Sequence, residues 1–119
     1  MADSAITTLM HTNLYEIFGQ RDPAPRREAI ARTYTEDIAF TDESGTIVGR
    51  TAIDDRVQQV LGNAPESFTF APDGPIYVGE DTAALAWRLG PADGDPVARG
   101  IDIATLKDGF ISAIQTLLS

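Results

Sequence analysis

Cysteine is absent from the 119-residue chain, and histidine occurs only once, at His11. Without cysteine the protein can form no disulfide, no thiolate metal site and no cysteine nucleophile. A single histidine also argues against a histidine-based metal centre and against a Ser-His-Asp triad. The simpler interpretation of His11 is one polar residue on the flank of a helix. We therefore expect neither a metal nor a cofactor.

Basic residues are also scarce. The chain has 9 Lys and Arg but 18 Asp and Glu, which gives a formal net charge of −9. Nucleic acids and anionic membranes bind proteins through basic surfaces, so this charge argues against both as partners. No apolar run approaches the ~20 residues of a membrane-spanning helix, and residues Met1–Asp3 show no signal peptide. These absences predict a cytoplasmic protein.

The composition that remains is ordinary for a globular protein, with 43% hydrophobic and 23% charged residues. A chain of this length is large enough to bury a hydrophobic core without covalent cross-links such as disulfides. The sequence shows no internal repeat, low-complexity tract or domain boundary. We therefore expect one domain over residues 1–119.

Three segments have the periodicity or the boundary residues of helices. The first is predicted over Ser4–Gly19, with an apolar stripe made by Ile6, Leu9, Met10, Leu14, Ile17 and Phe18. The second is predicted over Pro25–Thr35, because proline suits the first turn of a helix. The third, Thr51–Leu61, places Ile53 and Val57 on one face and stops at Gly62–Asn63.

The remaining segments alternate as strands do. A strand around Ile38, a tight turn and a second strand separate the second and third predicted helices. Five further strands are predicted in the C-terminal half, namely Ser67–Ala71, Ile76–Val78, Thr82–Leu89, Val97–Lys107 and Phe110–Leu118. The last of them follows a hairpin turn at Asp108–Gly109. Helices at one end and antiparallel strands at the other predict an α+β fold with the helices on one face of a curved sheet.

The alternation Ile38, Phe40, Asp42 is the most informative pattern. Side chains of equal parity share one face of a strand, so a carboxylate lies beside two large apolar residues. A buried carboxylate must be paired, hydrogen-bonded or neutral, and active sites are often built in this way. The alternative interpretation is that Asp42 ends the strand and opens the turn that follows with its side chain. The pattern by itself leaves both interpretations open.

With these elements placed, the chain resembles the NTF2-like superfamily, in its SnoaL-like and ketosteroid-isomerase-like branch. The resemblance covers nearly all of the chain, and its carriers are Tyr34–Asp42, Gly49–Ile53, Trp87, Gly100–Asp102 with Lys107–Gly109, and Ile111. It implies a cone, in which three N-terminal helices pack on a highly curved, mainly antiparallel sheet and a pocket opens between them. It also implies frequent homodimers through the outer face of the sheet.

The resemblance implies roles for two aspartates. In ketosteroid isomerases an aspartate at the end of the first strand moves the proton, and Asp42 falls at that position. A second acid on the penultimate strand stays protonated and donates to the developing oxyanion, and Asp102 falls there. The tyrosine that those enzymes carry on the first helix is missing, because Leu14 holds its position. The neighbouring Tyr15 points about 145° away from the apolar stripe.

Other reactions that enzymes of this fold carry out need a residue that this chain does not have at the corresponding position. An epoxide hydrolase of the limonene type would need an arginine where Gly100 stands, and we discount that reaction. A SnoaL-like polyketide cyclase would use Asp102 in an aldol closure, although no strand supplies a histidine partner. Trp87, on a strand between Leu85 and Leu89, is either core or pocket wall.

The leading hypothesis is a cofactor-independent isomerase or cyclase for a small apolar or carbonyl-containing molecule, with Asp42 as base and Asp102 as proton donor. The residues expected to bind the substrate are Leu14, Phe18, Phe40, Ile53, Val57 and Trp87. Two alternatives stay open: a non-catalytic module that binds an apolar ligand, and a dimerisation domain whose core is filled. A homodimer is expected because alternation along the last strand leaves apolar residues on both faces, Ile111, Ala113, Gln115 and Leu117 against Phe110, Ile114 and Leu118.

Overall fold

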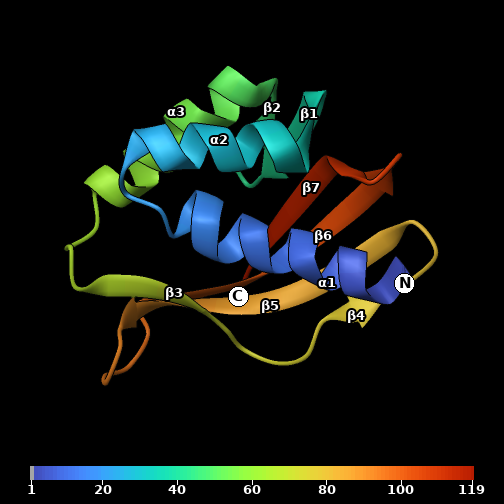
Figure 1. Ribbon diagram of the computed structural model, residues 1–119. Coiled ribbons are helices and arrows are strands. Elements are labelled where there is room, and N and C mark those ends of the chain that lie inside the picture. Colours follow the sequence, from blue (N-terminus) through green and yellow to red (C-terminus); the bar gives the residue numbers. More distant parts are fainter. Residues whose placement is uncertain (1) are drawn as a thin grey trace.

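The computed structural model describes residues 2–119, in which the helices form one layer and the strands another (Figure 1). Helix α1 (Ala2–His11) runs directly into η1 (Thr12–Phe18), a π-helical segment, so the two form one rod. Helix α2 spans Pro23–Thr33 and is capped by the Asp22 side chain, which accepts a hydrogen bond from the Ala24 amide over 3.1 Å. Helix α3 spans Arg50–Gly62.

The strands form one sheet in the order β2-β1-β7-β6-β5-β3, with β4 paired to β5. Only the pair β1 and β7 is parallel, and the other pairs are antiparallel. Their bounds are β1 Tyr34–Asp42, β2 Gly45–Val48, β3 Phe68–Pro72, β4 Tyr77–Val78, β5 Thr82–Pro91, β6 Ala98–Lys107 and β7 Phe110–Leu118.

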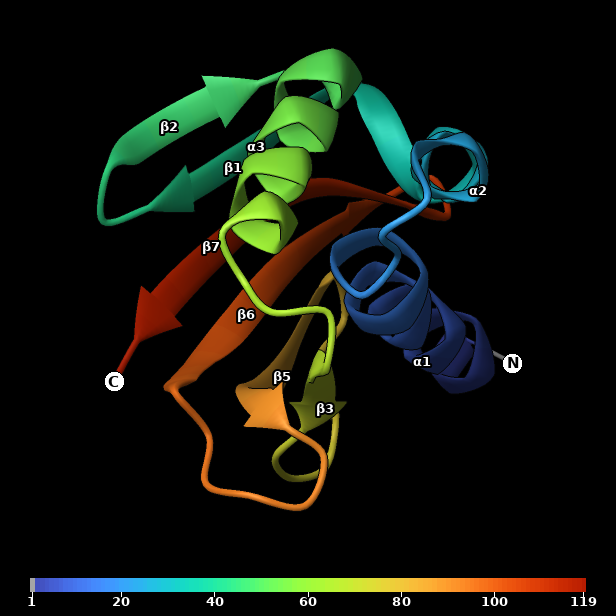
Figure 2. The ribbon, with the colours of Figure 1, turned by 90° about the vertical axis from the view of Figure 1, so that its left-hand side faces the viewer.

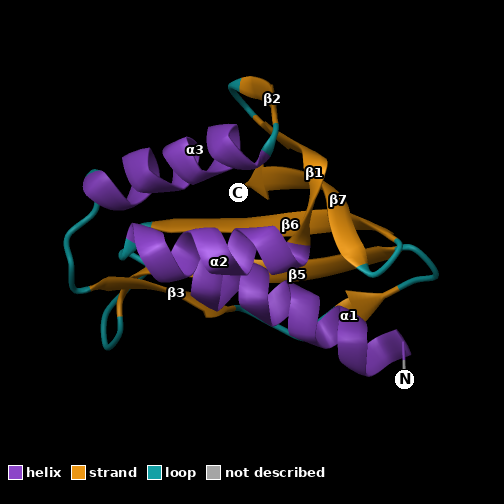
Figure 3. Cartoon of the chain, turned by 45° about the horizontal axis from the view of Figure 1, so that its top comes forward, coloured by secondary structure: helices purple, strands orange, loops and turns teal. Residues whose placement is uncertain are grey.

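The sheet curves around the helices, which all lie on its inner face (Figures 2 and 3). Helix α3 packs on β1 and β2 at one end of the sheet, while α1 and η1 pack on β5 and β3 at the other. Apolar residues from both layers join in one buried core that runs from Ile6 on α1 to Ile114 on β7. This is the α+β cone that the sequence predicts, with three helical rods on a mainly antiparallel sheet.

The predicted end of the second helix, Thr35, lies two residues beyond the observed end, Thr33. Tyr34 and Thr35 belong to β1 and not to the helix, because the backbone turns to extended geometry at Tyr34 (φ −104°, ψ 147°). Tyr34 then pairs in parallel with Ile111 of β7, a contact between segments far apart in sequence that outweighs local helix propensity. The other predicted boundaries lie within two residues of the observed ones.

The predicted faces of the last strand also need correction. Ile111 and Ile114 are both buried on the inner face, at 0% and 2% exposure. The pairing of β7 with β6 and with β1 shifts register between Ile111 and Ala113, and such an irregularity changes which parity faces inward. Ile111 therefore does not share the outer face with Ala113.

The Asp108–Gly109 hairpin between β6 and β7 has the predicted turn chemistry, since both residues have positive φ, 54° and 84°. The turn starts the pairing of β6 with β7, and the register shift between Leu106 and Thr105 then places Thr116 opposite Asp102. In the part of the chain that the structure describes, no helix has the length and apolar character needed to span a membrane.

Candidate active site

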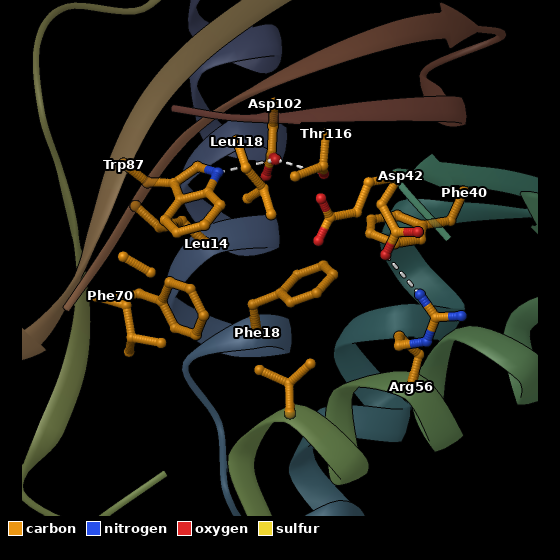
Figure 4. Close-up of a pocket in the computed structure, with 14 residues that line it drawn as sticks. Leu14, Phe18, Phe40, Asp42, Arg56, Phe70, Trp87, Asp102, Thr116 and Leu118 are labelled. Atoms are coloured by element: carbon orange, nitrogen blue, oxygen red, sulfur yellow. Dashed lines mark hydrogen bonds and ion pairs between the residues drawn. The ribbon is translucent and has the colours of Figure 1, made fainter. Parts of the chain in front are cut away.

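A cavity of about 220 Å³ opens between η1, α3 and the inner face of the sheet (Figure 4). Four aromatic rings line it, from Phe18, Phe40, Phe70 and Trp87, and they contact one another in a chain with centroid separations of 5.4–6.2 Å. Its polar lining consists of Asp42, Glu43, Arg56, Asp102 and Thr116. The cavity is thus an aromatic chamber with two separate groups of polar side chains.

Asp102, on β6, is the buried acid of the cavity, with 6% of its surface exposed. Its Oδ1 accepts hydrogen bonds from Trp87 Nε1 over 2.9 Å and from Thr116 Oγ1 over 2.7 Å. Its Oδ2 accepts one from Asn13 Nδ2 over 3.3 Å. The donors come from β5, β7 and η1, so the carboxyl joins two neighbouring strands and the N-terminal rod.

Burial raises the pKa of Asp102 above the usual aspartate value, because removal of water penalises the charged form. The hydrogen bonds from Thr116, Trp87 and Asn13 act in the opposite direction and do not cancel the effect of burial. Asp102 is therefore a carboxyl that gives up its proton less readily than one in water.

Gly100 makes the position of Trp87 possible. The two residues are cross-strand partners on β6 and β5, and a Cβ built on Gly100 would lie 2.6 Å from Cζ2 of the indole. Any larger residue would push the ring away. The absence of a side chain at this position, where the epoxide hydrolases need an arginine, thus lets the indole reach Asp102.

A second layer of polar residues stands behind Asp102. The hydroxyl of Tyr34, which is fully buried, donates to Asn13 Oδ1, and the Asn13 amide in turn donates to Asp102. Burial, and then the nearby Asp102, raises the pKa of Tyr34 well above 10, so the phenol stays protonated at neutral pH. Asn13 belongs to the π-helical segment, a geometry that is rare and frequent at functional sites.

Asp42 lies at the more exposed side of the cavity, with 19% of its side chain accessible. Its Oδ2 pairs with Arg56 Nη1 of α3 over 2.6 Å, and its Oδ1 accepts the amide of Ser44 over 2.8 Å. The Arg56 guanidinium also lies 6.0 Å from the centre of the Phe40 ring. Asp42 therefore both opens the turn and lines the cavity, so the two interpretations of the sequence pattern hold together.

A family model described as the SnoaL-like domain matches residues 11–114. The chain belongs to this family. The resemblance to the SnoaL-like branch of the NTF2-like superfamily is thereby confirmed. A search of curated proteins finds no sequence that matches.

Solved structures share the fold of this SnoaL-like domain. A SnoaL-like family protein from Agrobacterium tumefaciens strain C58, provisionally named an isomerase, is 23% identical with a TM-score of 0.87, over 98% of both chains. A provisionally named SnoaL-like polyketide cyclase from Jannaschia sp. CCS1 is 15% identical with a TM-score of 0.74, over 98% of this chain and 86% of the other.

A provisionally named ketosteroid isomerase from Kribbella flavida DSM 17836 is 16% identical with a TM-score of 0.72, over 98% of this chain and 78% of the other. At these identities the likeness establishes the fold, and the fold hosts unrelated functions. The function of this SnoaL-like domain therefore depends on the residues of its own cavity.

Six of the eight predicted site residues of this SnoaL-like domain line the cavity, namely Asp42, Asp102, Leu14, Phe18, Phe40 and Trp87. Ile53 and Val57 do not. Both are fully buried on the face of α3 that packs into the core, whereas Arg56 and Val60 of the same helix face the cavity. Phe40 and Trp87 form the walls of the cavity and do not fill it. Tyr15, 47% exposed, points away from it.

Sequence reasoning missed Asn13, Tyr34, Arg56 and Thr116. For Asn13 a signal exists, because it lies about 50° from the centre of the first apolar stripe at helical spacing and is a polar residue there. For Thr116 a signal also exists, because it alternates with Ile114 and Leu118 on one face of the last strand. For Arg56 the sequence holds no comparable signal, since its partner Asp42 is 14 positions away. No group of three or more side chains that could hold a metal is found within residues 2–119.

Proposed function

We propose that this SnoaL-like domain is a cofactor-independent isomerase or cyclase that acts on a small carbonyl compound. The observation that carries the proposal is that Asp42 and Asp102 line one aromatic cavity in different environments (Figure 4). Enzymes often carry out acid–base catalysis with two carboxyl groups that lie in different surroundings, one as acid and the other as base. Ketosteroid isomerase is an established example.

Asp102 suits the role of proton donor because burial raises its pKa, which favours the protonated form. Asp42 suits the role of base because it lies at the more exposed side of the cavity, where the Arg56 guanidinium contacts its carboxyl group. Asp42 would take a proton from the carbon beside the carbonyl, and the electrons of that C–H bond would form the enol double bond. Asp102 would give its proton to the carbonyl oxygen in the same step.

The enol then completes the reaction. In an isomerisation, the proton held by Asp42 returns to a different carbon and the enol oxygen returns its proton to Asp102. In a cyclisation, the enol carbon attacks a second carbonyl of the same molecule, the oxygen of that carbonyl takes the proton held by Asp42, and the enol oxygen returns its proton to Asp102 as its carbonyl re-forms. Both routes leave the two aspartates as they began, and neither needs a redox cofactor.

The size and charge of the cavity support a small, uncharged substrate. Its volume of about 220 Å³ is below the roughly 300–1,000 Å³ of drug-sized binding sites. Two carboxylates, Asp42 and Glu43, face one cation, Arg56, on its polar side, and the whole chain carries a formal charge of −9. Such a field disfavours carboxylate or phosphate ligands.

A second candidate function is the binding of an apolar ligand without catalysis. It is favoured by the contacts of Asp42, whose two oxygens are already engaged by Arg56 and Ser44. To act as a base, Asp42 must give up one of these two contacts so that the freed oxygen can reach the C–H bond of the substrate. A ligand held by the four aromatic rings alone would leave the ion pair undisturbed.

Hydrogen–deuterium exchange separates the two candidates without knowledge of the natural substrate. A panel of small cyclic ketones and β,γ-unsaturated ketones is followed by proton NMR in D2O with the intact protein. Catalysed exchange beside the carbonyl should be lost in Asp42→Asn and slowed about 100-fold or more in Asp102→Asn. Asp95→Asn, in the exposed loop before β6, is the matched control and should behave as wild type.

Binding of the same compounds is read from the fluorescence of Trp87, the only tryptophan of the chain. Binding without exchange would support the ligand-binding candidate and reject the enzymatic one. Neither binding nor exchange across the panel would count against both.

A further inference from the structure

Thr116 differs from the other two hydrogen-bond partners of Asp102, because its side chain can accept a proton as well as donate one. The indole of Trp87 can only donate. The amide nitrogen of Asn13 donates to Asp102 Oδ2, and the amide oxygen already accepts from Tyr34. The Thr116 hydroxyl lies 2.7 Å from Asp102 Oδ1 and has both a hydrogen and lone pairs. A proton on Oδ1 of Asp102 therefore has Thr116 as its acceptor, and the Asn13 contact stays as it is.

The hydroxyl of Thr116 is also a neutral donor that the cavity can offer to a ligand. Thr116 lines the cavity beside Asp102 and is half-buried, whereas Asp102 is 6% exposed (Figure 4). Apart from the acids, only Trp87 and Thr116 among the 14 lining residues have an uncharged side chain with a hydrogen to donate. Asp102 engages the N–H of Trp87. The hydroxyl of Thr116, in contrast, is released for a ligand when Asp102 becomes its donor.

We propose that Thr116 is a further catalytic residue, and that its hydroxyl transfers the proton of Asp102 to the carbonyl oxygen of the substrate. Before the reaction, protonated Asp102 donates to Thr116 Oγ1, and the Thr116 hydroxyl donates to the carbonyl oxygen. As the enol forms, the O–H bond of Thr116 breaks and its proton bonds to the carbonyl oxygen. The proton of Asp102 moves to Thr116 Oγ1 in the same step, which restores the hydroxyl and leaves Asp102 as a carboxylate. The hydroxyl then donates to that carboxylate, which is the arrangement observed.

The inference deepens the proposed function and rests on it, because it names the path of the proton that Asp102 gives up. The alternative path is direct donation from Oδ2 of Asp102, which accepts a single hydrogen bond, from Asn13. In that case Thr116 would keep donating to Oδ1 and would not touch the substrate. The two paths differ in which O–H group contacts the carbonyl oxygen, and that contact can be measured.

Infrared spectra of a bound ketone with an isotope-labelled carbonyl group report this contact whether or not the ketone reacts. A hydrogen bond to the oxygen lowers the stretching frequency of the C=O bond. Thr116→Val keeps the shape of the side chain and removes the hydroxyl, so the C=O band should lie at a higher frequency than in wild type. Thr116→Ser keeps the hydroxyl and should resemble wild type, as should the control Thr69→Val at an exposed position of β3. Identical bands in Thr116→Val and wild type would overturn the proposal.

The exchange assay gives a second measurement on the same variants. Exchange should slow about 100-fold or more in Thr116→Val, as expected when a donor to a developing oxyanion is lost, and stay near wild type in Thr116→Ser. An unchanged rate in Thr116→Val would contradict the proton path through Thr116. If wild type binds ketones without exchange, the proposed function fails, while the C=O band still decides whether Thr116 contacts the carbonyl oxygen. Absence of any ketone binding would reject both.

Discussion

Trp87 Nε1 donates to Asp102 Oδ1 over 2.9 Å and connects the only tryptophan of the chain to a buried carboxyl group. The bond crosses from β5 to β6 inside the cavity, so the indole is both a wall of the cavity and a partner of the acid. We therefore expect the fluorescence of Trp87 to report the charge on Asp102, even before a substrate is known.

The first prediction concerns pH. Burial holds the pKa of Asp102 above its unfolded value of about 3.9. Below that value both states are protonated. As pH rises, Asp102 of the unfolded chain ionises first, so the contribution of Asp102 to the free energy of unfolding should fall until the pH passes its folded pKa and stay level above it. Urea unfolding between pH 4 and pH 8 measures this slope, and Trp87 emission should change over the same interval.

Asp102→Asn removes the titrating group and should abolish this contribution and the change in emission. Near pH 7 the variant should be as stable as wild type or more so. Asp95→Asn should keep the wild-type slope. A large loss of stability for Asp102→Asn at pH 8 that shrinks at pH 5 would instead identify Asp102 as an ionised structural acceptor and reject the proton-donor role.

The second prediction concerns Gly100→Ala. A Cβ at this position would lie 2.6 Å from the Trp87 ring and 2.7 Å from the carbonyl oxygen of Leu117, so the indole must shift away. The variant should lose about 1–3 kcal/mol of stability, show altered Trp87 emission and lose the pH response of that emission. Gly62→Ala, where a Cβ meets nothing within 4 Å, is the control and should be neutral or stabilising. Unchanged emission in Gly100→Ala would show that the indole does not depend on this close approach.

The third prediction concerns the link between α2 and α3. The Arg26 guanidinium is 1% exposed and pairs with Asp54 Oδ1 over 2.6 Å, while Arg27 pairs with Oδ2 over 2.8 Å. Burial by itself raises the pKa of Asp54, but the hydrogen bonds from Arg27 and Arg26 outweigh it and hold the pKa below the usual value. Asp54→Asn leaves a buried charge without its partner and should cost about 3–5 kcal/mol.

The loss in Asp54→Asn should be full above the unfolded aspartate pKa and should shrink as pH falls through the folded pKa of Asp54. Chemical denaturation at pH 7 and pH 3 measures both. The control is Glu16→Gln, because Glu16 and Arg32 form an exposed pair and the melting temperature should hardly move. Equal effects of the two substitutions would contradict the structural role assigned to Asp54.

The sequence predicts the fold because the signals of its helices and strands are local. The alternation through Ile38, Phe40 and Asp42 places Asp42 on the face of two apolar residues, whereas Asp102 was assigned through the resemblance to ketosteroid isomerases. The aspartate partners of Arg56 and Thr116 could not be assigned in this way, because each meets its aspartate only after the chain has folded back. The burial of Tyr34 likewise depends on parallel pairing with Ile111, 77 positions away.

The last prediction concerns assembly. The helices cover only the inner face of the sheet, and the outer face carries small and apolar residues on β1, β6 and β7, among them Ala39, Ile103 and Ala113 around a shallow groove. We propose that a second copy of the chain covers this face through a two-fold axis. Light scattering at micromolar concentration should then give a particle of about twice 12.8 kDa. Ile103→Glu should halve that mass because it places a charge in the interface, whereas Val97→Glu, at an exposed position before β6, should not. A 12.8 kDa particle for the wild-type protein would rule out the dimer.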